Sequence, residues 1–283
     1  MRKALEIKNL GIQFKGFELK NVEFCVEPGT IMGLVGNNGA GKTTILKSIL
    51  NFYKLKSGSI RVFGMDYLEE EVEVKNCIGY VASEDYLKYN MTLGEYEKLF
   101  SQIYEEWDGE YFRELVARYQ LPMKKKFSEF SKGMKTLAML VLAMAHKPKL
   151  LVLDEPTAGL DPVVRGEFLE MLREFVEDGE RAVLFSTHIT TDLDKVADYI
   201  TLLIQGEAVE SASVDAWEEA YVLAVGEQEE LRQIGIGATK QAGRIETLIR
   251  RSQMEQIKKE YPEVSFQNPN IEQIVVHNIL EKR

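Results

Sequence analysis

The residues whose types and spacing most directly suggest chemistry run from Gly36 to Thr43 and read GNNGAGKT. In this pattern glycines turn backbone amides onto phosphate oxygens, the lysine reaches the outer phosphates and the threonine holds Mg²⁺. A glycine-rich turn that only joined a strand to a helix would not need Lys42 and Thr43 at these places. The residues expected to bind a nucleotide are Gly36, Asn37, Asn38, Gly39, Ala40, Gly41, Lys42, Thr43 and Thr44.

Polar side chains also follow two later apolar runs. Leu150–Leu153 leads directly to Asp154 and Glu155, and the run ending at Phe185 is followed three residues later by His188. Because ligands of open α/β sheets bind at the carboxyl ends of the strands, these side chains should lie near the phosphate loop. We expect Asp154 to bind magnesium through water, and Lys42, Glu155 and His188 to act in catalysis. Glu155 would orient or deprotonate the attacking water, and His188 would contact the γ-phosphate.

A further anion site is suggested by Ser131 and Gly133, which open an apolar helical run. A serine hydroxyl, a glycine amide and a helix amino terminus together favour an anion. Taken alone, the pattern is more often an ordinary helix cap. Its meaning therefore depends on the neighbouring motifs.

The elements that must position these residues indicate an α/β fold. Short strands with alternating apolar and polar residues are expected at the start of the chain. A strand at 30–35 leads into the phosphate loop, and a helix follows from residue 43. Buried parallel strands are expected at 150–153 and 182–185, with an amphipathic helix between them. We predict a mostly parallel sheet of the P-loop NTPase type, an amino-terminal antiparallel β portion and an inserted α-helical subdomain at about 84–148. Residues 1–210 would form one domain, and 211–283 a small α+β extension.

Composition narrows the class of function. The chain has 283 residues, 45% of them hydrophobic, and a net charge of −10, which argues against broad binding to nucleic acid. Cys25 and Cys77 lie far apart with no histidine nearby, so a zinc site is not expected. The most apolar run, 136–146, is too short to cross a bilayer, and no leader opens the sequence. We expect the chain to be soluble by itself.

A phosphate loop alone would fit kinases, GTPases, helicases and transport ATPases. With the later motifs in the same order, residues 1 to about 210 resemble the ATP-binding cassette (ABC) family of transport ATPases. Phe130–Met134 matches the family signature, Asp154 and Glu155 the Walker B pair, Ala158–Asp161 the loop that links two active sites, and His188 the switch histidine. The resemblance implies a head-to-tail dimer in which Ser131 and Gly133 of one protomer close on the ATP of the other.

Two positions depart from the family pattern or leave a choice open. Phe14, or less favourably Phe17, falls near the family position for an aromatic ring that stacks on adenine, although a core phenylalanine is an equal alternative. Where the family has a glutamine that touches magnesium, this chain reads Ala82-Ser83-Glu84. We expect Ser83 to be a weak magnesium ligand, with Glu84 as a substitute.

The expected partners also follow from the resemblance. A second ABC protomer, identical or related, would complete the dimer. The aromatic-rich stretch from Tyr86 to Trp107 suits either the core of the helical subdomain or a groove for a short helix of a membrane permease subunit. That subunit would be a separate polypeptide, and this chain would lie at the cytoplasmic, inner face of the cell membrane.

Within the family, the signature SKGM and the carboxy-terminal extension resemble the bacterial drug and antibiotic exporter branch. The resemblance implies an ATP-hydrolysing subunit, with ATP and Mg²⁺ as cofactors, that powers export. The alternatives are an ABC-type ATPase without a membrane partner and a scaffold that binds ATP without turnover. The first usually carries a second cassette or a long coiled coil, and the second would be expected to lack Glu155.

Overall fold

The core of the molecule is a sheet of mostly parallel strands. The computed structural model describes residues 2–83, 87, 90–241 and 243–282. Across the sheet the strands follow the order β10 (Glu207–Ser213), β9 (Tyr199–Ile204), β3 (Ile31–Val35), β8 (Ala182–Thr187), β7 (Leu150–Asp154) and β6 (Ile78–Val81). β10 pairs with β9 in antiparallel fashion, and the other pairs are parallel. β3, β7 and β8 are buried along their whole length, because elements cover both faces of the sheet.

Alternate residues of these strands enter two different hydrophobic cores. Leu151 and Leu153 join one core, and Leu150 and Val152 join the other. This alternation follows from the period of two along a strand, in which successive side chains point to opposite faces. The continuous apolar run therefore serves both faces at once.

An antiparallel sheet contributes to the core that contains Leu150 and Val152. Its strands follow the order β2 (Phe17–Val26), β1 (Leu5–Phe14), β4 (Ser57–Val62) and β5 (Met65–Asp66). These strands share a core with helix α1 (Lys42–Ile49), which begins at the end of the phosphate loop. The predicted antiparallel amino-terminal portion is therefore confirmed, and its strands are longer than the alternation alone indicated.

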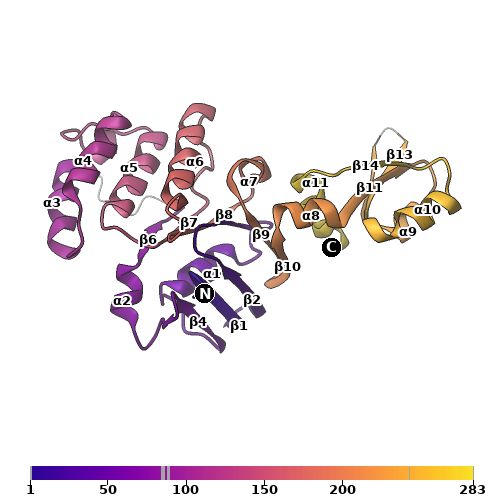
Figure 1. Cartoon of the computed structure of the whole chain (residues 1–283), viewed down its shortest axis with the longest axis horizontal. Coiled ribbons are helices and arrows are strands. Elements are labelled where there is room, and N and C mark those ends of the chain that lie inside the picture. The colour runs from indigo at the N-terminus through magenta and orange to yellow at the C-terminus, as the bar shows by residue number, and fades with distance from the viewer. Residues whose placement is uncertain (1, 84–86, 88–89, 242, 283) are drawn as a thin grey trace.

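The inserted helices lie at one end of the molecule (Figure 1). They are α3 (Leu93–Ile103), α4 (Gly109–Arg118) and α5 (Lys132–Met144). Their buried side chains belong to the core that contains Leu151 and Leu153. Thr92 caps α3 through a capping box with Glu95. Helix α2 (Glu71–Asn76) precedes β6, while α6 (Pro162–Val176) and α7 (Thr190–Val196) follow β7 and β8.

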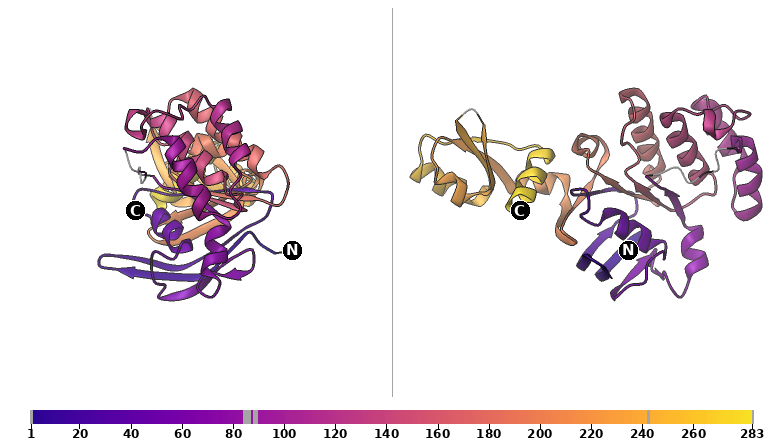
Figure 2. Two further views of the ribbon diagram at one scale, coloured as in Figure 1. Left: turned by 90° about the vertical axis from the view of Figure 1, so that its left-hand side faces the viewer. Right: turned by 180° about the vertical axis from the view of Figure 1, so that it is seen from behind.

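The carboxy-terminal extension projects as a separate lobe at the opposite end (Figures 1 and 2). Its antiparallel sheet has the order β12 (Ile236–Gln241), β13 (Arg244–Arg250), β11 (Tyr221–Gly226) and β14 (Ser265–Gln267). Its helices are α8 (Val214–Ala220), α9 (Leu231–Ile234), α10 (Met254–Glu260) and α11 (Ile271–Glu281). Asn270 caps the last of these. The predicted α+β character of the extension is confirmed.

The extension is joined to the main body through shared apolar side chains. Trp217, Tyr221 and Ile274 belong to the same core as the helical subdomain and one face of the main sheet. Strand β10 spans the domain boundary predicted at residue 210 and pairs with β9, so the exact boundary stays a prediction. Among the described residues, no helix combines the length and the apolar character that a membrane span requires.

Candidate active site

The phosphate loop connects β3 to α1 and approaches its neighbours closely. A Cβ atom at Gly36 would lie 2.2 Å from the carbonyl oxygen of Leu203, so only glycine fits there. Gly41 adopts φ 111°, which disfavours any other residue. Lys42 is 5% exposed, and its Nζ donates to the carbonyl of Gly36 at 2.7 Å. The loop therefore holds the lysine over its own backbone.

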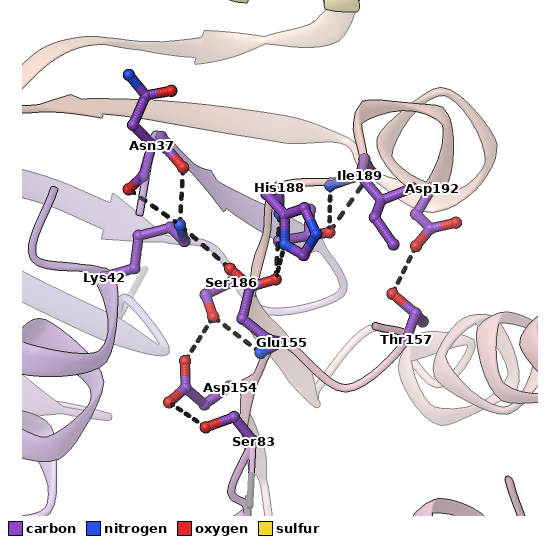
Figure 3. A network of polar contacts seen from close by, with 12 residues as sticks. Asn37, Lys42, Ser83, Asp154, Glu155, Thr157, Ser186, His188, Ile189 and Asp192 are labelled. Atoms are coloured by element: carbon purple, nitrogen blue, oxygen red, sulfur yellow. Dashed lines mark hydrogen bonds and ion pairs between the residues drawn. The ribbon is translucent and has the colours of Figure 1, made fainter. Parts of the chain in front are cut away.

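Glu155 contacts the other two predicted catalytic side chains (Figure 3). Its Oε1 lies 3.1 Å from Lys42 Nζ, and its Oε2 lies 2.5 Å from His188 Nδ1. The backbone N–H of His188 also donates to Oε2, at 3.2 Å. Glu155 has φ 49°, an uncommon value for a residue other than glycine, and such strain is often found at active sites. The structure thus brings together Lys42, Glu155 and His188.

Asp154 is fully buried and accepts hydrogen bonds from hydroxyl groups. Thr43 Oγ1 lies 3.0 and 2.9 Å from its two carboxylate oxygens, Ser186 Oγ donates at 2.8 Å and Ser83 Oγ at 3.3 Å. Burial, and secondly the charge of Asp154, raises the pKa of Tyr80 to about 12. The position is thus electronegative and rich in oxygen donors.

This donor set fits Mg²⁺, which prefers oxygen and is usually held by one or two carboxylates together with substrate phosphates and water. The described residues contain no cluster of three or more His, Cys, Asp or Glu side chains that would make an all-protein metal site. Thr43, Asp154 and Ser83 therefore lie where the sequence predicted magnesium ligands, while Glu84 falls outside the described residues.

A cavity of about 630 Å³ opens beside the phosphate loop. It is lined by Phe17, Asn37, Asn38, Gly39, Gly41, Lys42, Thr43, Thr44, Glu155, Ala158 and His188. Most of the residues predicted to bind the nucleotide are on this wall. Ala40 is instead buried behind it, at 4% exposure.

The two candidate adenine rings occupy different places. Phe17 lines the cavity, whereas Phe14 is 40% exposed and packs edge-on against Tyr53, with 5.0 Å between ring centroids. Phe14 and Phe17 are paired at the turn of the β1–β2 hairpin, so both stay close to the site. The structure favours Phe17 as a cavity residue, and stacking by Phe14 stays a prediction.

Ser131 and Gly133 do not line the cavity of their own chain. Ser131 is the N-cap residue of α5, and its Oγ accepts a hydrogen bond from the backbone N–H of Met134 at 3.2 Å. A Cβ atom at Gly133 would lie 3.0 Å from Val164 on α6. The role of Ser131 as a helix cap is confirmed. Contact of Ser131 and Gly133 with the nucleotide of a partner protomer stays a prediction.

Sequence reasoning missed two parts of the site. Ser186 donates to Asp154 and accepts from the backbone N–H of Glu155 at 3.0 Å, so it fixes both carboxylate residues. Its place at the end of a buried strand was a usable signal. The second part is a cavity of about 480 Å³ in which Val275 and Val276 of α11 face Asn37 and His188. No local motif predicts that the extension reaches the phosphate loop.

The aromatic-rich segment serves partly as core and partly as the wall of a groove. Tyr96 is 3% exposed and belongs to the core, whereas Phe100, Tyr104 and His146 line a groove of about 330 Å³ together with Phe52, which is 66% exposed. Tyr86 and Tyr89 fall outside the described residues. The described aromatic residues therefore contribute both to the core and to the wall of a groove, and binding of a permease helix in this groove stays a prediction.

Comparisons with known proteins agree with the motifs. A model of the ABC transporter family matches residues 19–158. The ABC transporter ATP-binding protein YtrB of Bacillus subtilis (strain 168) is 32% identical over 219 residues, which cover 77% of this chain and 75% of YtrB. The bacitracin transport ATP-binding protein BcrA of Enterococcus faecalis is 31% identical over 222 residues, covering 76% of this chain and 70% of BcrA. A solved structure of the ATP-binding subunit of an ABC transporter matches with a TM-score of 0.70 and 29% identity, covering 76% of this chain and 92% of its own.

Proposed function

This chain belongs to the ABC transporter ATPases, and we propose that it hydrolyses MgATP in a head-to-tail dimer to drive export through a separate membrane subunit. The observation that carries the proposal is the convergence of Lys42, Glu155 and His188 on the wall of the phosphate-loop cavity. A scaffold that only held ATP would not need a carboxylate at this point.

Each residue has a distinct task in the proposed reaction. Amides of the phosphate loop and Lys42 bind the β- and γ-phosphates, and Glu155 accepts a proton from the water that attacks the γ-phosphorus. His188 contacts the γ-phosphate. Thr43 and Asp154 would hold Mg²⁺, with Ser83 as a weaker ligand, and the ion supplies positive charge that stabilises the phosphate oxygens.

The proposed dimer follows from the separation of the two half-sites within one chain. Ser131 and Gly133 lie outside the cavity of their own protomer, and this position is compatible with a dimer in which a second copy, or a related chain, would bring its own signature to that cavity. ATP would hold the two protomers together until hydrolysis removes the γ-phosphate contacts.

The proposed membrane partner is a permease subunit, and its short helix would bind the groove lined by Phe52, Phe100, Tyr104 and His146. The chain would then lie at the cytoplasmic face of the membrane. Export is supported by the likeness to BcrA, whose name refers to bacitracin transport. Purification from membranes, with identification of any bound permease, tests this part. Recovery of the chain without any membrane subunit would favour an ABC ATPase that acts alone.

The hydrolytic part is tested with Glu155→Gln. The variant should lose ATP turnover by about 10²-fold or more and should become dimeric with ATP, because closure persists when hydrolysis stops. Size-exclusion chromatography with light scattering measures the dimer, and phosphate release measures turnover. Glu170→Gln, which changes an exposed carboxylate on α6, is the matched control. A Glu155→Gln protein that stays monomeric with ATP, or that turns over at the wild-type rate, rejects the proposal.

A further inference from the structure

A buried carboxylate links the two sides of the site. Asp192 is fully buried in the first turn of α7, four residues after His188. Its Oδ2 accepts a hydrogen bond from Thr157 Oγ1 at 2.6 Å, and its Oδ1 lies 3.9 Å from Nε of Arg165 (Figure 3 shows the Thr157 contact). A carboxylate without solvent requires such partners, because burying a charge is costly unless it is hydrogen-bonded and paired.

The two partners of Asp192 flank one loop. Thr157 directly precedes Ala158–Asp161, the segment that matches the linking loop, and Arg165 follows it in the first turns of α6. Thr157 is itself fully buried and lies two residues after Glu155. The carboxylate of Asp192 on α7 therefore contacts residues on both sides of this loop.

This arrangement runs in parallel with the contact between Glu155 and His188. Those two side chains now bind each other, and in the proposed reaction both must turn toward water and the γ-phosphate. The Thr157–Asp192 hydrogen bond lies outside the cavity and does not depend on the positions of their side chains. It can keep the two backbone segments together while the catalytic side chains change partners.

We propose that Asp192 is a positioning residue that ties the loop after Glu155 to helix α7, which begins two residues after His188. The inference rests on the proposed hydrolytic function of the site. Its consequence is a specific kinetic effect, because misplacing a catalytic group by about 1 Å can cost as much as 10²-fold in rate while binding is retained.

The test removes the hydrogen bond with little change in shape. Thr157→Val replaces the hydroxyl by a methyl group, and Thr157→Ser keeps the hydroxyl. Thr247→Val is the matched control, because Thr247 is also fully buried and donates to a carbonyl in the extension, at 3.2 Å from Ile236 O. Steady-state phosphate release gives kcat and KM, and thermal denaturation checks folding at the assay temperature.

The expected result is a kcat lowered by about tenfold or more in Thr157→Val, with KM for ATP changed by less than about twofold. Thr157→Ser and Thr247→Val should stay within about twofold of the wild-type kcat. Asp192→Asn should also lower kcat, because it loses the charge that faces Arg165. If Asp192→Asn does not fold, the two Thr157 variants still decide the question.

The outcomes separate this inference from the proposed function. A wild-type protein without ATPase activity, or Glu155→Gln with full activity, rejects the hydrolytic function itself. An active wild type together with an unchanged kcat in Thr157→Val rejects the positioning role. Equal loss in Thr157→Val and Thr157→Ser, or a loss that only follows the unfolded fraction, also rejects it.

Discussion

Acidification should destabilise this protein through His146, a buried histidine at the proposed permease groove. The residue is 4% exposed, its ring stacks on Tyr104 with 4.2 Å between centroids, and Nε2 lies 3.2 Å from the carbonyl oxygen of Ile78. Because a carbonyl only accepts, Nε2 must carry the proton in the neutral ring. Nδ1 is buried and has no hydrogen-bond partner among the described residues, so a second proton would have no acceptor.

Burial lowers the pKa of His146 from 6.5 to about 4, and the contact with Ile78 opposes this only in part. The unfolded chain therefore binds a proton first as the pH falls. The stability that the neutral ring contributes is complete above pH 6.5 and is lost between pH 6.5 and 4. The gap between the two values corresponds to about 3 kcal/mol in total, of which about 2 kcal/mol is lost by pH 5.

Urea denaturation of the wild type and of His146→Gln, at intervals from pH 7.5 to 4.5, measures the effect. Glutamine can still donate to the carbonyl of Ile78 but does not titrate. Carboxylates elsewhere titrate equally in both proteins, so the difference between the curves isolates the histidine. The gap in unfolding free energy should shift by about 2 kcal/mol toward the variant between pH 7.5 and 5. Parallel curves over this interval would refute the assignment of a buried neutral ring.

Three further predictions concern the nucleotide site. Gly36→Ala should weaken ATP binding by about tenfold or more in equilibrium titration, since its Cβ would meet the Leu203 carbonyl. The control Gly166→Ala, whose Cβ would have no atom within 4 Å, should stabilise α6 by about 0.5–1 kcal/mol in denaturant melts. Equal ATP affinities in the two variants would contradict this prediction. Ser131→Ala should cost about 1 kcal/mol of stability and Ser131→Gly only a few tenths, because glycine tolerates the N-cap position. Both should lose ATP turnover, and retained turnover would leave Ser131 as a cap alone. Glu155→Gln should bind ATP about tenfold more tightly than wild type, because Lys42 no longer has to leave a charged partner at 3.1 Å; weaker binding would count against this competition.

The parts of the fold that could be predicted are those with local physical causes. The run Leu150–Leu153 has to supply both cores, and a parallel strand covered on two faces satisfies it. Thr92 and Asn270 stand three residues before side chains that complete capping boxes, and both helices begin there. The carboxyl ends of β7 and β8 then bring Asp154, Glu155 and His188 to one edge of the sheet.

The contacts that could not be predicted join segments distant in the sequence. Asp192 and Thr157 lie 35 positions apart, and α11 reaches the phosphate loop from the far end of the chain. Neither pairing has a periodic or motif signal, because each depends on how packed elements meet. The choice between Phe14 and Phe17 was also tertiary, since both flank one hairpin turn and only the neighbouring loop decides which of them lines the cavity.

The motifs indicated the candidate catalytic residues but not the contacts that these residues make with one another. Lys42 and His188, which would contact phosphate in the proposed reaction, contact the two carboxylate oxygens of Glu155. Without the contact between them, the buried lysine and the nearly buried carboxylate would each lack an oppositely charged partner at this distance. In the proposed reaction, binding of ATP would exchange these contacts of Lys42 and His188 for contacts with phosphate, and the exchange would free Glu155 for water. In the proposed reaction, this pairing would make the role of Glu155 depend on the presence of substrate.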